Sequence, residues 1–225
     1  WPALPAQPAP VLFVLAGSRM ETLSSRYFRQ AGHYLAKDGV LCVSMDLPCH
    51  GDEATPDIKG LTGWRTRCEQ GHDLVEEVTH RLSRVLDHLL AEGLADPKKI
   101  AVSGTSRGAF IASHFAIRDP RVGPVLAFAP LTDLARLKEF QGSEKLPLVQ
   151  ALALEKNAAG LADNPFWLVI GDRDDRVGTD AAISLARAVT AAGLAGKSHG
   201  DVDLHVIAEP RGHTVPAGYA EAGAE

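Results

Sequence analysis

The pentapeptide Gly104-Thr105-Ser106-Arg107-Gly108 decides how the chain folds. A β-branched run at residues 99–103 leads into it, and residues 109–115 lead out of it with apolar side chains at helical spacing. This order predicts a strand, a tight turn and a helix, the context in which a G-x-S-x-G serine stands exposed on strained backbone. We expect the two glycines there because a side chain at either position would collide with the neighbouring strand or helix. The five residues alone would also fit an ordinary Gly/Ser turn.

Composition narrows the class of protein. The chain has 225 residues, 45% of them hydrophobic, which predicts one domain over residues 1–225 with a buried core. A net charge of −5 and the lack of a basic stripe argue against nucleic acid as a partner. No apolar stretch is long enough to cross a bilayer, so we expect no membrane span.

The three cysteines bear on the compartment. Cys42, Cys49 and Cys68 form neither a paired framework nor a C-x-x-C motif, so neither a disulfide scaffold nor a zinc site is indicated. Free thiols favour a reducing compartment, and we expect the cytoplasm. The chain begins at Trp1 rather than Met, which indicates processing, so a periplasmic or secreted location after removal of a signal peptide is the alternative.

Hydrophobic runs and helical spacing alternate along the chain. The sequence predicts strands at residues 11–15, 40–45, 99–103, 122–128, 166–170 and 202–207, and helices at 27–35, 75–89, 109–115 and 181–192. Residues 1–10 read as an extended leading segment, residues 52–71 as a turn-rich loop, and residues 131–164 as two short helices that form a small lid. Alternation of this kind predicts an α/β fold, a three-layer αβα sandwich around a mostly parallel sheet.

Three reactive side chains follow the ends of predicted strands. Ser106 follows one strand, aspartates 172, 174 and 175 follow the strand at 166–170, and His213 follows the strand at 202–207. A serine hydroxyl needs a base, and the base needs a third group to hold its tautomer. Because the carboxyl ends of parallel strands meet at one edge of the sheet, the sequence predicts a Ser-His-Asp triad there.

The chain resembles the α/β-hydrolase fold, within it the branch of dienelactone hydrolases and prolyl-oligopeptidase-like serine hydrolases. The resemblance rests on four features: the G-x-S-x-G turn at residues 104–108 (the elbow), the ordered triad, the run Asp96-Pro97-Lys98-Lys99-Ile100 and the loop Asp174-Asp175-Arg176-Val177. It extends from Val11 to His213. Similar families place the acid three residues after the loop glycine and three before a valine. The resemblance therefore implies Asp174 as the acid, with Asp175 next.

The resemblance also implies an oxyanion hole and a pocket. The backbone N–H groups of Arg107 and of the loop after the first strand would form the hole, and Ala16-Gly17-Ser18 matches the usual His-Gly-X loop without its histidine. Ser18 is then the expected donor and Arg19 the alternative. The side chains expected to line the pocket are those of Arg19, Trp64, Phe128 and Arg176.

Other polar residues receive structural interpretations. His50 lies in Asp46-Leu47-Pro48-Cys49-His50-Gly51, which resembles a D-x-x-x-H-G turn common in this fold, and we expect it to be structural. No histidine pair has metal-ligand spacing, so we expect no metal site and no cofactor. Arg107 and Arg176 could steer an acidic substrate group, although Arg107 would equally fit a solvated position or a pair with a loop carboxylate.

The expected function is hydrolysis of a small carboxylic ester through an acyl-enzyme on Ser106, with a small-molecule ester as the substrate. Two alternatives remain: a peptidase of the prolyl-oligopeptidase type, and a non-catalytic hydrolase fold that binds a ligand. Only ten residues precede the first predicted strand, so we expect a minimal N-terminus without the two antiparallel strands that usually open this fold.

Overall fold

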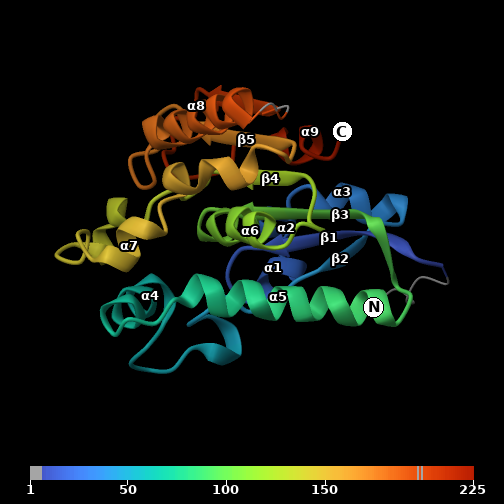
Figure 1. Cartoon of the computed structure of the whole chain (residues 1–225), viewed down its shortest axis with the longest axis horizontal. Helices are drawn as coiled ribbons and strands as arrows, with labels where there is room; N and C mark the ends of the chain where they lie inside the picture. The colour runs from blue at the N-terminus through green and yellow to red at the C-terminus, as the bar shows by residue number, and fades with distance from the viewer. Residues whose placement is uncertain (1–6, 197, 199) are drawn as a thin grey trace.

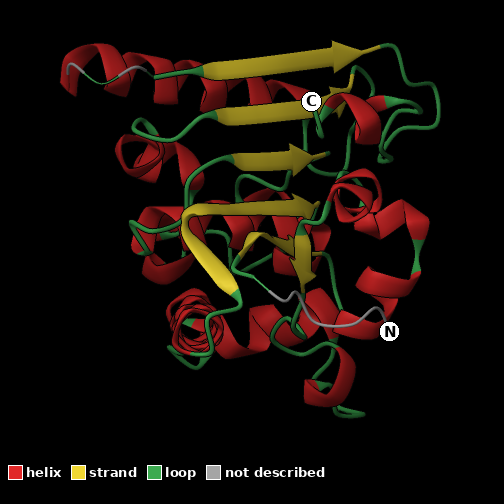
Figure 2. Ribbon diagram, turned by 90° about the vertical axis from the view of Figure 1, so that its right-hand side faces the viewer, coloured by secondary structure: helices red, strands yellow, loops and turns green. Residues whose placement is uncertain are grey.

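The computed structural model describes residues 7–196, 198 and 200–225. Within them the strands join one six-stranded sheet in the order β2-β1-β3-β4-β5-β6, and every neighbouring pair is parallel. Figure 2 shows the strands side by side in one twisted sheet. The strands are β1 (Ala9–Leu15), β2 (Leu41–Val43), β3 (Ala95–Thr105), β4 (Val125–Phe128), β5 (Phe166–Gly171) and β6 (Val202–Ile207).

Helices cover both faces of this sheet, which makes the predicted three-layer sandwich. The α-helices are α1 (Arg19–Ser24), α2 (Arg26–Arg29), α3 (Gly32–Leu35), α4 (Gly60–Glu69), α5 (Leu74–Ala91), α6 (Arg107–Arg118), α7 (Pro147–Ala151), α8 (Thr179–Gly196) and α9 (Tyr219–Ala222). The 3₁₀ turns are η1 (Ala36–Asp38), η2 (Gly51–Glu53), η3 (Leu134–Arg136), η4 (Lys138–Phe140) and η5 (Leu154–Leu161). In Figure 1, α4 and α7 lie together at one end of the molecule.

Alternating side chains divide the core between the two faces. In β5, Phe166, Leu168 and Ile170 pack in the larger core, whereas Trp167 and Val169 pack on the opposite side. The larger core contains the buried residues of α5, α6 and α8, and the smaller one contains residues near α3 and α9. A strand buried on both faces has a continuous apolar sequence, which is why apolar runs such as residues 166–170 predict strands.

Three segments differ from their sequence expectations. The single helix expected at 27–35 is wrong: the chain forms α2 and α3 instead, with Gln30 between them at a φ of 45°. The loop expected at 52–71 contains α4. Residues 131–164 hold η3 and η4 before Gly142, then α7 and η5 after it, so they are four short elements rather than two helices. Residues 1–6 of the expected leading segment lie outside the described residues, and β1 begins at Ala9.

Candidate active site

Ser106 occupies the turn between β3 and α6. Its backbone has a φ of 55° and a ψ of −116°, a conformation that costs energy for a residue with a side chain. A Cβ on Gly104 would lie 2.3 Å from the Gly108 carbonyl carbon, and one on Gly108 would lie 1.9 Å from the Leu15 carbonyl oxygen. The expectation that both glycines are needed for close approach is confirmed.

A hydrogen-bonded chain runs from Ser106 through His213 to Asp174. The His213 Nε2 lies 3.0 Å from the Ser106 Oγ, and its Nδ1 lies 2.7 Å from the Asp174 Oδ2. The Asp174 side chain is fully buried, whereas 24% of the His213 side chain is exposed. An ionised carboxylate can only accept a hydrogen bond, so Asp174 favours the imidazole tautomer that carries its hydrogen on Nδ1, and Nε2 is left to accept a hydrogen bond from the serine hydroxyl.

The three aspartates of the β5 loop have different surroundings. The Asp174 Oδ1 accepts the backbone N–H groups of Arg176 and Val177, both at 3.2 Å, so its second oxygen is held toward the imidazole. Asp172 instead bonds to the loop that follows β6, and Asp175 is exposed. Of the three, the structure brings only Asp174 to the imidazole.

Contacts within the loop and from Tyr27 of α2 hold the loop that carries His213. The Glu209 carboxylate binds the Arg211 guanidinium and backbone N–H, and these bonds lower the pKa of Glu209 to about 2. Beyond the histidine, the Tyr27 hydroxyl accepts the backbone N–H of Val215 at 3.2 Å and lies 3.3 Å from the Thr214 hydroxyl. No local sequence signal links Tyr27 to a loop 187 residues away, and sequence analysis missed it.

The expected oxyanion-hole donors, Arg107 and Ser18, differ from the alternative donor, Arg19, in whether the backbone N–H already has an acceptor. Among the described residues, no protein acceptor takes the backbone N–H of Arg107 or Ser18. The backbone N–H of Arg19, by contrast, donates to the Asp46 Oδ1 at 2.6 Å. The backbone N–H of Arg19 therefore already has an acceptor, whereas those of Ser18 and Arg107 have none among the described residues.

Three of the four expected pocket residues line neither of the two hollows described below. Trp64 is fully buried in the core, with its indole N–H donating to the Pro48 carbonyl at 2.6 Å. Phe128 is fully buried in the smaller core. The Arg19 guanidinium binds Asp46 and Asp52, and 44% of the Arg19 side chain is exposed. Bulky aromatic groups are drawn into the core by the apolar area they bury, which accounts for the positions of Trp64 in α4 and Phe128 at the end of β4.

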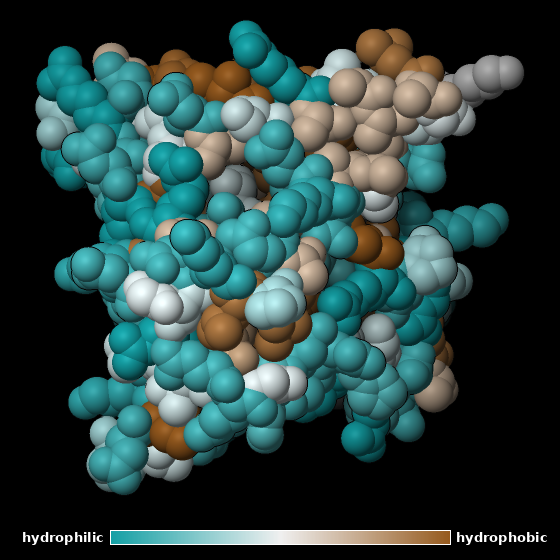
Figure 3. All heavy atoms as spheres, turned by 60° about the vertical axis from the view of Figure 1, so that its left-hand side comes forward, coloured by the Kyte–Doolittle hydropathy of each residue, from teal (hydrophilic) through white to brown (hydrophobic). Residues whose placement is uncertain are grey.

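A hollow of about 360 Å³ does include the fourth residue, Arg176. Its lining comes from the start of α4, from the loop before it and from three charged residues elsewhere in the chain: Pro56, Asp57, Lys59, Gly60, Leu61, Thr62, Arg107, Glu139 and Arg176. Two of the lining residues are close in sequence to the triad: Arg107 directly follows Ser106, and Arg176 lies two residues after Asp174. Figure 3 turns the α4 and α7 end forward and shows small hydrophobic patches between hydrophilic side chains.

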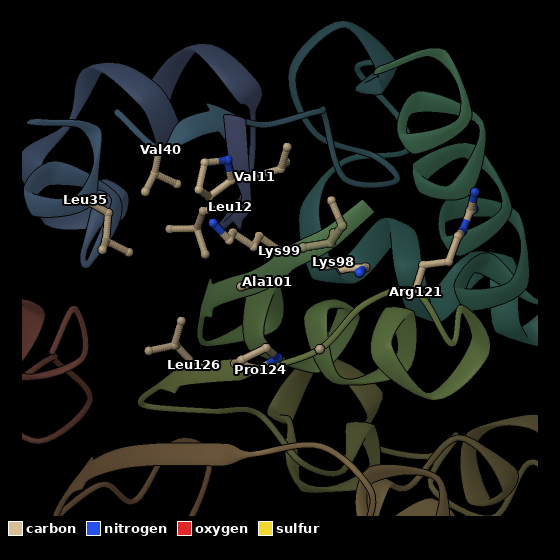
Figure 4. Close-up of a pocket in the computed structure, with 13 residues that line it drawn as sticks. Val11, Leu12, Leu35, Val40, Lys98, Lys99, Ala101, Arg121, Pro124 and Leu126 are labelled. Carbon is tan, nitrogen blue, oxygen red and sulfur yellow. The ribbon is translucent and has the colours of Figure 1, made fainter. Parts of the chain in front are cut away.

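A second hollow, of about 350 Å³, lies at the amino-terminal ends of the strands, opposite the end that carries Ser106. Figure 4 shows its apolar part, with Leu12, Leu35 and Leu126, and its basic part, with Lys98 and Arg121. These residues surround the amino-terminal half of β3, whereas Ser106 follows its carboxyl end, about 20 Å further along an extended strand. This hollow is therefore not part of the candidate active site.

His50 contacts the residue after the nucleophile, a contact that sequence analysis missed. The His50 Nε2 lies 2.7 Å from the Arg107 Nη1, and the ring's Nδ1 lies 2.9 Å from the Pro48 carbonyl oxygen. Burial lowers the pKa of His50, and the charge of Arg107 lowers it further. The D-x-x-x-H-G pattern placed His50 in a turn but could not reveal its partner, which lies 57 residues away.

Two further findings concern the described residues as a whole. Within residues 7–196, 198 and 200–225, no group of three or more His, Cys, Asp or Glu side chains could hold a metal ion. No helix in this part of the chain is long and apolar enough to span a membrane.

Residues 11–155 match the family model described as alpha/beta hydrolase family. No curated protein sequence matches the chain. Among solved structures, TT1662 from Thermus thermophilus superposes with a TM-score of 0.72 and 22% identity, over 98% of this chain and 88% of that one. Acetyl xylan esterase 1 from Thermoanaerobacterium sp. superposes with a TM-score of 0.70 and 14% identity, over 97% of this chain and 74% of that one.

Larger proteins share the same fold. The acylaminoacyl peptidase of Pyrococcus horikoshii superposes with a TM-score of 0.70 and 14% identity, over 99% of this chain. This chain spans only 35% of that peptidase and 29% of another matched structure, from Bacteroides ovatus. At these identities the likeness concerns the fold alone.

Proposed function

Because the chain belongs to the alpha/beta hydrolase family, we propose that it is a serine hydrolase that cleaves carboxylic esters through an acyl-enzyme on Ser106. One observation carries the proposal: the Ser106 Oγ, the His213 ring and the Asp174 carboxylate form a continuous hydrogen-bonded chain, with distances of 3.0 and 2.7 Å. A buried acid, an imidazole held in one tautomer and a half-buried serine on strained backbone are the parts that nucleophilic catalysis requires.

In the first half of the proposed reaction, the Ser106 Oγ attacks the ester carbonyl carbon while His213 Nε2 takes the hydroxyl proton. The imidazolium then donates that proton to the leaving alkoxide as the carbon–oxygen bond breaks, which leaves an acyl-serine. In the second half, water attacks the acyl carbon while His213 takes a proton from that water. The imidazolium then returns the proton to the Ser106 Oγ as the bond between the acyl carbon and Oγ breaks, and the carboxylic acid is released. Asp174 stays ionised and stabilises the imidazolium.

The negative oxygen of each tetrahedral intermediate needs donors that are already in place. We assign this role to the backbone N–H groups of Arg107 and Ser18, which have no protein acceptor among the described residues. Removing one such donor typically costs about 10²–10³-fold in kcat. Since both are backbone groups, side-chain substitution at these positions leaves the hole itself in place.

Peptide hydrolysis is the second candidate function. The fold match to the Pyrococcus horikoshii acylaminoacyl peptidase favours it. Comparing p-nitrophenyl acetate with acylaminoacyl and proline-linked p-nitroanilides separates the two functions. We expect the ratio of kcat/KM, ester over amide, to exceed the ratio of the uncatalysed hydrolysis rates of the same compounds. Preferential cleavage of the amides would favour the peptidase.

The chain's organisation enters as part of the same proposal. We propose a single domain, because the described strands join one sheet. We also propose that the first half of residues 131–164 forms a fixed wall of the hollow that Arg107 and Arg176 line, rather than a moving lid. There the Ser143 hydroxyl bonds to Glu69 of α4 at 2.5 Å, and Glu139 lines the hollow. The second half, η5, packs against α6 and α8.

The free thiols support a proposed location. Cys42, Cys49 and Cys68 are unpaired, and a reducing cytoplasm is the compartment that keeps such thiols free. Cell fractionation with antibody detection tests this assignment. Recovery in the periplasmic or secreted fraction would contradict it.

The decisive test replaces the nucleophile. We expect Ser106→Ala to lower kcat for p-nitrophenyl acetate by about 10⁴–10⁶-fold. Ser24→Ala, at an exposed serine at the end of α1, serves as the matched control and should retain the parent rate. A parent rate in the Ser106 variant would refute the proposal, and a parent protein without hydrolytic activity on esters or amides would favour a binding protein.

A further inference from the structure

The Arg107 guanidinium carries a positive charge that its direct partner does not neutralise. Its Nη1 lies 2.7 Å from the His50 Nε2, and the His50 Nδ1 lies 2.9 Å from the Pro48 carbonyl oxygen. Because a carbonyl oxygen can only accept, Nδ1 carries the ring hydrogen and Nε2 is the acceptor for Arg107. A neutral imidazole orients the guanidinium but supplies no negative charge.

The charged groups near Arg107 do not balance its positive charge. Burial and the positive charge of Arg176 lower the pKa of Arg107, and they outweigh the favourable charges of Glu139 and Glu21. Glu139 is already engaged, since its Oε1 accepts from the Arg176 Nη2 at 2.8 Å. An anion that reached Arg107 would therefore relieve an unfavourable charge.

Arg107 lies where a substrate group could reach it. It lines the hollow of about 360 Å³ together with Lys59 and Arg176, against the acidic residues Asp57 and Glu139. The lining thus holds three cations and two anions, and one of those anions is paired with Arg176. The remaining guanidinium hydrogens of Arg107 are suited to a carboxylate, which a planar guanidinium binds through two parallel hydrogen bonds.

We propose that this hollow is a carboxylate subsite, and that the preferred substrates are esters bearing a second, ionised carboxyl group. The inference rests on the proposed function, since the subsite selects substrates only if Ser106 attacks them. Arg107 then contributes twice: its backbone N–H faces the oxyanion, and its side chain binds the substrate's carboxylate. His50 is a positioning residue that holds the guanidinium toward the hollow.

Two esters with the same skeleton test the subsite. Mono-p-nitrophenyl glutarate carries a free carboxylate, and p-nitrophenyl methyl glutarate has that group capped. We expect the parent to show a kcat/KM ratio, free over capped, of about 10 or more, and Arg107→Met to lower that ratio by about 10- to 100-fold, the range for losing a charged hydrogen bond. The ratio cancels any general effect of the substitution on catalysis.

A matched control and a salt series sharpen the result. Arg84→Met removes an exposed arginine on α5, outside the hollow, and should leave the ratio unchanged. Raising the ionic strength from about 0.01 to 1 M shortens the screening length from about 30 to 3 Å, so the parent ratio should fall. Acetoxybenzoate, with its carboxylate in the leaving group, and its methyl ester show which side of the ester the subsite serves.

A binding experiment separates this inference from the proposed function. In the Ser106→Ala background the esters are not turned over, and calorimetry should show tighter binding of the free glutarate ester than of the capped one, with the difference lost on adding Arg107→Met. Equal binding of both esters, or a difference that survives Arg107→Met, overturns the subsite even if the parent hydrolyses esters. A parent protein with no hydrolytic activity overturns the proposed function, and the binding result still decides the subsite.

Discussion

Asp172 joins the two loops that carry the acid and the base of the candidate triad: its Oδ1 accepts the backbone N–H of Glu209 at 2.8 Å. Asp172 begins the loop after β5, two residues before Asp174, and Glu209 lies four residues before His213. Gly171 tightens the same junction, because a Cβ there would lie 2.9 Å from the Glu209 Cβ. The distance between acid and base thus depends on a bond that involves neither.

Removing this bond should impair catalysis more than binding. We expect Asp172→Ala to lower kcat by about 10- to 100-fold with little change in KM, because a misplacement of about 1 Å in a catalytic group has that effect. Asp172→Asn keeps an oxygen acceptor and should restore most of the rate. Steady-state kinetics on p-nitrophenyl acetate measure both variants, and an unchanged kcat in Asp172→Ala would show that the loops hold their positions without this bond.

The choice of acid is testable with neighbouring aspartates. We expect Asp174→Asn to lower kcat by about 10⁴-fold, because an amide stabilises the wrong tautomer of the imidazole. Asp175→Asn, at the next position and exposed, should stay within a few-fold of the parent. The reverse order of effects would assign the acid to Asp175.

Gly108 should tolerate no side chain. In Gly108→Ala the new Cβ would lie 1.9 Å from the Leu15 carbonyl oxygen and 2.4 Å from its carbon, and backbone atoms cannot move aside cheaply. We expect the free energy of unfolding to fall by about 3 kcal/mol or more, which lowers Tm by roughly 6–12 °C. Gly196→Ala is the control for thermal denaturation, because among the described residues its Cβ would meet only the Ser198 hydroxyl, at 4.0 Å. Equal Tm values for the two variants would contradict the close packing of the elbow.

Buried His114 should make stability depend on pH. Burial lowers its pKa from 6.5 to about 4, although the bond from its Nε2 to the Leu152 carbonyl favours the charged form. Between pH 6.5 and 4 the unfolded chain binds a proton that the folded chain does not, so the free energy of unfolding falls as the pH is lowered through this window. The full loss is about 3 kcal/mol.

His114→Gln isolates this contribution. A glutamine amide can still donate to Leu152 but does not titrate, so we expect a shallower loss of stability between pH 6.5 and 4 than in the parent. Urea denaturation at several pH values measures the slopes. His80→Gln, at an exposed position of α5, should keep the parent slope, and identical slopes in the parent and His114→Gln would contradict the assignment.

The strands and the elbow were predictable because their signals are local. Continuous apolar runs mark strands buried on both faces, and the glycines of the elbow encode close backbone approach at Ser106. The geometry of a parallel sheet, whose carboxyl ends collect the loops, then predicted that Ser106, the aspartates of the loop after β5 and His213 lie together. The choice of Asp174 among those aspartates came from the resemblance to the α/β-hydrolase fold. For this reason the fold and the identity of the candidate triad residues were accessible before any coordinates.

The misses have tertiary causes. Helix α4 contains Gly60, Thr62 and Gly63, which are weak helix formers, and its signal was the spacing of Leu61, Trp64 and Cys68, all buried. Their burial overrides the local preference for a turn. The bonds from Arg107 to His50 and from Asp172 to Glu209 join distant segments, and no periodicity in the sequence encodes such pairs.

The measurement closest to the central claim is intact-protein mass spectrometry after treatment with a fluorophosphonate, followed by peptide mapping. We predict a single covalent adduct on Ser106 in the parent, none in Ser106→Ala, and strongly slowed labelling in His213→Gln, because the imidazole activates the hydroxyl that attacks the phosphorus. A folded parent protein that takes no adduct, or one labelled at another serine, would contradict the account.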